Sequence, residues 1–101
     1  MKKDNRKSLL KAADVMKTLS HPVRLGILCD LLHNGEMSAG DIAQGWKTSA
    51  SQSQVSQYLA EFRRLKYVKA RKEGQSVYYT FSSPFIESVI GLFYKEFCKR
   101  P

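Results

Sequence analysis

The segment from residue 51 to residue 65 restricts the fold of this chain more than any other part of the sequence. Its apolar residues recur at helical spacing and are Val55, Leu59, Phe62 and Leu65. They form one apolar stripe, so the segment is predicted to be a helix with one buried side. The exposed side opens with hydroxyl and amide side chains, where an ordinary surface helix carries Glu and Lys.

Such side chains suit the reading of DNA bases. Gln can bond adenine through two hydrogen bonds, and Ser bonds either kind of base partner. The cations that follow, Arg63, Arg64 and Lys66, suit phosphate groups. A helix with polar readers at its N-terminal end and cations behind them fits the recognition helix of a helix-turn-helix. The plainer alternative is a well-capped surface helix. The predicted DNA-binding residues on this helix are Ser51, Gln52, Ser53, Gln54, Ser56, Gln57, Arg63 and Arg64.

The length and charge of the chain favour one small domain that binds a polyanion. Its 101 residues suffice for a single modest core, and 43% hydrophobic residues are typical of a globular fold. The formal net charge of +8 predicts nucleic acid as the first candidate partner and an anionic membrane as the second. Because no apolar run is long enough to span a bilayer and no signal-peptide pattern opens the chain, we expect a cytoplasmic protein with a single domain, residues 1–101.

Three helices are predicted before the recognition helix and one at the end of the chain. Their expected ranges run up to about residue 18, from 23 to about 33, from 39 to about 46 and from 85 to about 99. Ser20 is expected to cap the second helix and Ser38 the third, while Gly35 ends the second.

Residues 68–81 change from helical to alternating periodicity, which predicts a β-hairpin with Gly74 in its turn. A basic hairpin directly after a recognition helix is typical of the wing of a winged helix-turn-helix. Cations on a hairpin also protect an exposed edge strand, which is the alternative explanation. The fold class is therefore predicted to be mainly α with a β-hairpin wing. The wing residues predicted to contact DNA are Arg71, Lys72 and Gln75.

The last helix carries an apolar stripe that is too wide for the rest of so small a chain to cover. We therefore expect this helix and the first one to pack against a second copy in a two-fold homodimer. The alternative is that the two helices cover each other within one chain. The predicted dimerisation residues are Leu9, Leu10, Ala13, Val89, Phe93 and Phe97.

The order of these elements resembles the ArsR/SmtB family of winged-helix repressors. Three segments carry the resemblance, namely Leu19–Leu28, Ser53–Leu59 and Gly74–Tyr79. The chain differs in having Tyr58 where the family usually has His, and its turn before the recognition helix is about two residues longer. The resemblance implies a homodimer whose recognition helices enter successive major grooves of an inverted-repeat operator in double-stranded DNA.

Many members of that family sense metals, but the expected ligands are missing. The third helix reads Asp41-Ile42-Ala43 where the thiolate-based sensors carry a Cys-containing box, and the final helix lacks the His residues of the zinc sensors. The two histidines, His21 and His33, do not make a tetrahedral zinc site. No metal ligand and no cofactor are therefore predicted, although a metal site between subunits remains an alternative.

The two cysteines, Cys29 and Cys98, lie on the second and last helices, as in the redox- and persulfide-sensing branch of the family, the SqrR, BigR and HlyU type. Buried cysteine also packs as a small hydrophobe, which is the alternative for Cys29. Desolvation disfavours the Cys29 thiolate, whereas Cys98 has Lys95, Lys99 and Arg100 nearby. Cys98 is thus expected to react first and Cys29 to close a disulfide or a polysulfide bridge.

The sequence as a whole predicts a thiol-based transcriptional repressor, released from its operator when a small oxidant or polysulfide links Cys29 to Cys98. One alternative is a metal-responsive repressor. Another is a DNA-binding or anti-repressor protein that is indifferent to its cysteines. An enzyme is not expected, because the chain has no C-x-x-C motif and no nearby catalytic His.

Overall fold

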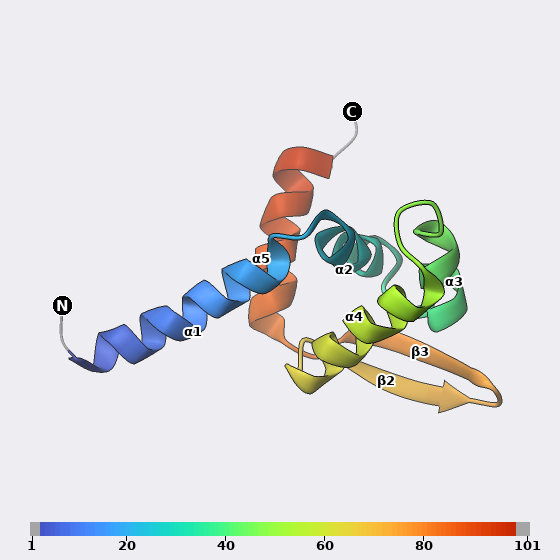
Figure 1. Cartoon of the computed structure of the whole chain (residues 1–101), viewed down its shortest axis with the longest axis horizontal. Coiled ribbons are helices and arrows are strands. Elements are labelled where there is room, and N and C mark those ends of the chain that lie inside the picture. The colour runs from blue at the N-terminus through green and yellow to red at the C-terminus, as the bar shows by residue number, and fades with distance from the viewer. Residues whose placement is uncertain (1–2, 99–101) are drawn as a thin grey trace.

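A computed structural model describes residues 3–98 of the chain, with side chains from residue 5 onward (Figure 1). The elements in order are α1 (Lys3–Leu19), α2 (Pro22–Asn34), β1 (Met37–Ser38), α3 (Ala39–Gly45), α4 (Gln52–Arg64), β2 (Val68–Glu73), β3 (Ser76–Phe81), α5 (Pro84–Phe93) and the π-helix η1 (Tyr94–Cys98). The predicted helices and hairpin are therefore present in the predicted order. None of the described helices is long and apolar enough to cross a membrane.

Helix α2 lies at the centre of the hydrophobic core. Its side chains Ile27, Leu28 and Leu31 have no solvent exposure. They belong to one buried cluster with Phe62 of α4 and Ile90 of α5, which are also fully buried. This cluster joins the helices to the sheet, because Val68 of β2 belongs to it as well.

The sheet has three strands in the order β1-β3-β2, all antiparallel. Strands β2 and β3 pair from Val68 opposite Phe81 to Glu73 opposite Ser76, and Gly74 adopts a φ of +61° in the turn between them. The wing prediction is thus confirmed. Strand β1 was not predicted, because two residues are too few to show an alternating pattern.

The predicted cap of α2 is wrong. His21, not Ser20, is the N-cap residue, and its Nδ1 accepts hydrogen bonds from the backbone N–H groups of Val23 at 3.2 Å and Arg24 at 3.5 Å. Ser20 instead closes α1, since its hydroxyl donates to the Lys17 carbonyl at 2.7 Å. Ser20 therefore bonds a free carbonyl at the C-terminal end of α1, and the His21 imidazole bonds the free N–H groups at the N-terminal end of α2.

The end of the chain also differs from the predicted single α-helix. Regular α-helix stops at Phe93, and η1 continues with the wider turns of a π-helix as far as Cys98. Lys99, the predicted end of this helix, lies outside the described residues. π-Helical turns are rare and often occur at functional sites.

Helix α1 projects away from the rest of the molecule (Figure 1). Its Leu9, Leu10 and Met16 side chains are 50%, 67% and 73% exposed. Between α1, α2 and α5 lies an apolar groove of about 720 Å³. The groove is lined by Ala12, Val15, Met16, Leu19, Ser20, Pro22, Leu25, Phe85, Val89 and Phe93.

Gly26 of α2 gives a test of how α3 is held against the core. A Cβ atom at this position would lie 2.1 Å from the Trp46 ring, so Gly26→Ala is expected to destabilise the fold by about 1–3 kcal/mol through overpacking. Gly40 of α3 has open space around it, and Gly40→Ala is expected to stabilise the protein by about 0.5–1 kcal/mol. Urea unfolding measures both values. Equal effects of the two substitutions would contradict the close packing at Gly26.

Candidate nucleic-acid interface and thiol pair

A capping box forms the front of the recognition helix α4. The Ser51 hydroxyl accepts a hydrogen bond from the Gln54 N–H at 3.1 Å, and Oε1 of Gln54 accepts one from the Ser51 N–H at 2.8 Å. These two predicted base readers therefore also hold the helix end together. The Gln54 side chain keeps its amide N–H₂ as a donor, and the Ser51 hydroxyl keeps its own hydrogen as a donor.

The remaining predicted readers lie on one exposed face of α4. Gln52, Ser53, Ser56 and Gln57 are all exposed, and Ser53 and Gln57 lie opposite the buried stripe of Val55, Leu59 and Phe62. Ala60 continues this face toward the C-terminal end of the helix and is also exposed. The sequence reading did not include Ala60, but a small side chain there lets the helix backbone come close to a groove wall.

The two arginines at the end of α4 differ in their surroundings. Arg64 pairs with Glu61 through its Nε at 3.1 Å and through a second guanidinium nitrogen. The Arg64 hydrogen bond lowers the pKa of Glu61, and Glu61 in turn raises the pKa of Arg64. Arg63 forms no ion pair within the described part of the chain. Arg63 is therefore the freer of the two for a phosphate group.

Arg71 of the wing has structural partners that the sequence did not reveal. Its guanidinium lies 2.9 Å from a Glu36 carboxylate oxygen and 2.6 Å from one of Glu73, and 4.8 Å from the centre of the Tyr78 ring. Both carboxylates raise the pKa of Arg71. Arg71 thus ties the wing to the segment before β1. Lys72 and Gln75 are exposed near the tip, and neither side chain is hydrogen-bonded or ion-paired to another described residue.

Tyr58 contacts α2 rather than the exposed face of α4. Its ring centre lies 5.4 Å from that of His21 and 5.7 Å from the Arg24 guanidinium carbon. Nε of Arg24 is buried and has no hydrogen-bond partner among the described residues. This cluster joins the first turn of α2 to the recognition helix. The hint of it in the sequence is Arg24, a cation in the first half of a helix rich in Leu and Ile.

The structure brings Cys29 and Cys98 together. Cys29 is buried on α2 with 9% exposure, Cys98 is exposed at the end of η1, and the Cys98 thiol is close enough to Cys29 to raise its pKa. Burial first, and then the neighbouring Cys98 and Asp30, raise the pKa of the Cys29 thiol to about 11. Lys95 is exposed on η1, while Lys99 and Arg100 lie outside the described residues.

A second contact joins the same two helices one turn away. The Tyr94 hydroxyl lies 2.8 Å from Nδ1 of His33, and the two rings stack with centres 5.9 Å apart. His33 follows Cys29 by four residues on α2, and Tyr94 precedes Cys98 by four residues on η1. Within residues 3–98, no group of three or more His, Cys, Asp or Glu side chains could hold a metal ion.

Known proteins resemble the chain over almost its whole length, although no protein-family model matches it. The transcriptional activator HlyU of Vibrio cholerae is 40% identical over 93 residues, covering 92% of this chain and 83% of that protein. The chain belongs to the ArsR/SmtB family of winged-helix transcriptional regulators. The solved structure of reduced HlyU from Vibrio cholerae matches this ArsR/SmtB protein with a TM-score of 0.84 at 37% identity, over 97% of this chain and 100% of that chain.

The transcriptional repressor BigR of Xylella fastidiosa matches with a TM-score of 0.80 at 30% identity, and both chains are covered completely. Like these relatives, the ArsR/SmtB protein described here is a DNA-binding transcriptional regulator and not an enzyme. The predicted family and fold class are confirmed. The individual DNA contacts remain predictions.

Gln57 is the best residue to test as a base reader, because its side chain takes no part in the helix cap. Gln57→Ala is expected to reduce discrimination between operator and unrelated DNA by about 1–3 kcal/mol, the cost of one lost bidentate contact. Fluorescence anisotropy with both duplexes measures this value. Gln44→Ala, which removes an exposed amide from α3, serves as the matched control. Equal losses on both duplexes would exclude Gln57 from base reading.

Proposed function

We propose that this protein is a thiol-responsive repressor whose reduced homodimer binds an inverted-repeat operator and whose oxidised or sulfur-bridged form binds it weakly. The observation that carries the proposal is the proximity of the buried Cys29 thiol of α2 to the exposed Cys98 thiol of η1. An exposed thiol can meet a small oxidant, and a buried neighbour can then close the bridge. Cysteines that only pack in a core do not require this pairing of one exposed and one buried thiol.

The two thiols divide the chemistry between them. With an organic persulfide RSSH, the Cys98 thiolate attacks the sulfane sulfur, forms Cys98–S–SH and releases RS⁻. Cys29 then loses its proton and attacks the Cys98 sulfur, which forms a disulfide and releases hydrosulfide. In sum, two thiols and RSSH give one disulfide, RSH and H₂S. A bridge that keeps one extra sulfur consumes a second RSSH as oxidant.

The order of attack follows from the surroundings of each thiol. A pKa of about 11 keeps Cys29 protonated at neutral pH, so Cys98 supplies the first nucleophile. Cys29 ionises only when Cys98 presents an electrophilic sulfur beside it. The wider turns of η1 give the Cys98 backbone a way to adjust when the bridge forms.

Helix α2 offers a physical connection from the thiols to the DNA-binding elements. Asp30 follows Cys29 directly and accepts a hydrogen bond from Nε1 of Trp46, at the end of α3, at 2.9 Å. Two turns earlier on α2, His21 and Arg24 contact Tyr58 of α4. Fixing α2 to η1 through a covalent bridge therefore acts on both helices of the helix-turn-helix, and a change in their spacing or flexibility reduces affinity for DNA.

Dimerisation is supported by the groove between α1, α2 and α5. It is almost wholly apolar and joins the exposed side chains of α1 to Phe93 of α5, which is 40% exposed. Phe97, on η1, is 77% exposed. Monomeric proteins rarely expose so much contiguous apolar surface. We propose that two copies bury this apolar surface against each other in a two-fold dimer, with the predicted residues Leu9, Leu10, Ala13 and Val89 in the contact.

The relatives include both kinds of regulator, since HlyU is an activator and BigR is a repressor. That this protein represses is therefore part of the proposal. Repression follows directly from operator binding by the reduced form. An anti-repressor, which displaces another DNA-binding protein, would use the same contacts with DNA.

Cys98→Ser tests the thiol proposal. Reduced wild-type protein is expected to bind an inverted-repeat promoter fragment, and organic polysulfide is expected to weaken that binding at least tenfold. The variant is expected to keep its affinity under the same treatment. Intact mass on the same samples identifies the Cys29 to Cys98 link and any extra sulfur.

Iodoacetamide labelling provides an independent control of the order of attack. At neutral pH Cys98 is expected to label well before Cys29, and labelling of Cys29 is expected to rise as the pH approaches 11. Polysulfide treatment that leaves wild-type binding unchanged would refute the sensor and favour a regulator indifferent to its cysteines.

Phe93→Asp tests the proposed dimer, because it places a charge in the apolar groove. The variant is expected to sediment as a monomer, since burying an unpaired carboxylate costs several kcal/mol or more. Ser88→Asp adds the same charge to α5 at an exposed position that does not line the groove, and it is expected to remain dimeric. A dimeric Phe93→Asp protein would place the interface elsewhere.

A further inference from the structure

Lys66, at the end of the recognition helix, has a backbone conformation that normally belongs to glycine. Its φ is +64°, and among the described residues it is the one non-glycine residue with positive φ. The helix ends in a Schellman motif, since the Lys66 N–H donates to the Arg63 carbonyl at 3.0 Å and the Tyr67 N–H donates to the Phe62 carbonyl at 2.8 Å. Lys66 occupies the position where glycine is usual, because glycine has no Cβ to clash.

The rest of the motif is built as this kind of helix end requires. The Phe62 and Tyr67 rings stack with centres 6.2 Å apart, which supplies the apolar contact that accompanies the motif. The Lys66 carbonyl accepts a hydrogen bond from the Ser82 hydroxyl at 2.8 Å. These contacts hold the backbone but do not use the lysine ammonium group. A strained position that keeps a cation, where glycine would be less strained, indicates a role for that cation outside the fold.

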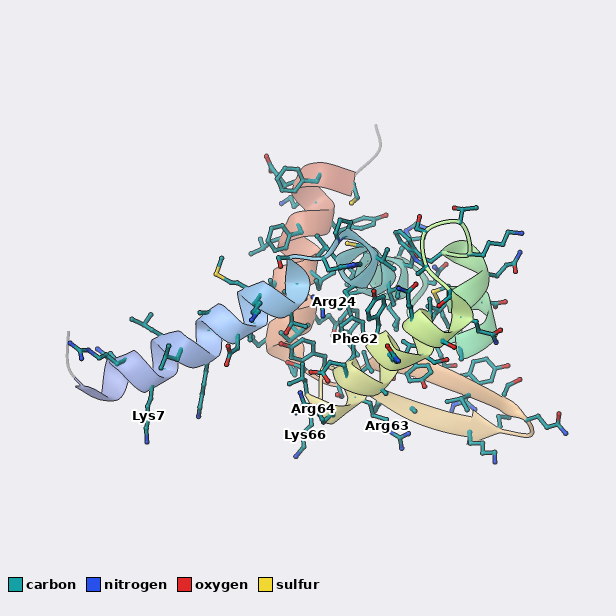
Figure 2. The ribbon with its side chains drawn as sticks, in the orientation of Figure 1. Lys7, Arg24, Phe62, Arg63, Arg64 and Lys66 are labelled. Atoms are coloured by element: carbon teal, nitrogen blue, oxygen red, sulfur yellow. The ribbon has the colours of Figure 1, made fainter. Side chains whose placement is uncertain are left out.

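Helix α1 brings two further lysines to the same side of the molecule. Burial raises the pKa of Tyr67, which follows α4, and the Glu61 carboxylate raises it further. Two side chains of α1 also act on this pKa, since Thr18 lowers it and Asp14 raises it. The face of α1 that carries Asp14 and Thr18 therefore lies beside the end of α4. Lys7 and Lys11 precede Asp14 and Thr18 by helical spacing and share their face. In Figure 2 the Lys7, Arg63 and Lys66 side chains point toward the same edge of the molecule.

We propose that Lys66, Lys11 and Lys7 form a second phosphate-binding surface, the α1 ridge, which holds the DNA backbone beyond the recognition helix and the wing. The inference rests on the DNA-binding function and adds residues and a helix to it. None of the three lysines forms an ion pair within the described part of the chain, so each ammonium is available for a phosphate. Phosphates of duplex DNA are the polyanion that a protein of net charge +8 already binds through α4.

The α1 ridge also has a length that suits this role. From Thr18 to Lys7 the helix rises roughly 16 Å, at 1.5 Å per residue. Duplex DNA rises 3.4 Å per base pair, so the ridge can reach phosphates up to about five base pairs beyond the end of α4. These contacts carry no base information, and they lengthen the footprint without changing the sequence that is read.

Three variants of Lys66 separate its charge from its backbone conformation. Lys66→Gly and Lys66→Asn remove the charge while both residues tolerate positive φ, so folding stability is expected to be unchanged or higher. Affinity of the reduced protein for a mixed-sequence duplex is expected to fall. The slope of log K against log salt is expected to decrease in magnitude by about 0.9 for each subunit, or about 1.8 for the bound dimer. Lys66→Arg keeps the charge and is expected to retain the wild-type slope.

Lys7→Gln with Lys11→Gln tests the α1 part of the ridge. This double variant is expected to lose about 1.8 from the salt slope for each subunit, or about 3.6 for the bound dimer, and to shorten the hydroxyl-radical footprint. The matched control is Lys17→Gln with Lys95→Gln, which removes two exposed charges that lie off the ridge face. The control is expected to keep a slope near the wild-type value.

The outcomes distinguish the ridge from the proposed function itself. Unchanged slopes and footprints in the ridge variants, with normal wild-type binding, would overturn the ridge alone. Equal slope losses in the double variant and in its control would show a general charge effect and would also overturn it. A wild-type protein without salt-dependent binding to any duplex would instead refute DNA binding by this chain.

Discussion

The burial of α2 is the constraint on which the rest of the structure depends. Ile27, Leu28 and Leu31 have no exposure, and the helix packs against α1, α5 and the sheet while its polar positions contact α3 and α4. A helix enclosed in this way cannot shift without moving its neighbours, because close-packed interiors transmit displacement rather than absorb it. Because Cys29 lies on this helix, a covalent bond to its thiol that displaces the helix would displace the neighbouring elements as well.

Periodicity made the elements predictable, and long-range contacts set the limit. The apolar stripes of α2, α4 and α5 were legible because burial on one face leaves a repeat of 3.6 residues. The His21 cap, strand β1 and the π-helical end were not, since each depends on a few residues whose local preferences are weak. The cysteines illustrate the same limit. Their helices could be assigned from the sequence, but the contact between residues 69 positions apart comes only from the packing of η1 against α2.

Several of the residues predicted to contact DNA also stabilise the fold. Gln54 closes the capping box with the oxygen of its amide and retains the nitrogen, while Arg71 is already paired with Glu36 and Glu73. The chemical type of these side chains was enough to predict them as DNA contacts. It did not show which of their polar atoms are already bonded within the protein. The side chains of Gln52, Ser53, Ser56 and Gln57 form no hydrogen bond or ion pair with other described residues. This face could therefore bind bases without breaking contacts within the protein.

The hydrogen bond between Trp46 and Asp30 has a spectroscopic consequence. Trp46 is the single tryptophan of the chain, its indole N–H donates to the residue next to Cys29, and its ring lies against Gly26. Indole emission depends on the polarity and hydrogen bonding around the ring. The protein therefore carries an intrinsic fluorophore at the junction of the thiol-bearing helix and the helix-turn-helix, and its emission wavelength reports directly on that junction without any attached dye.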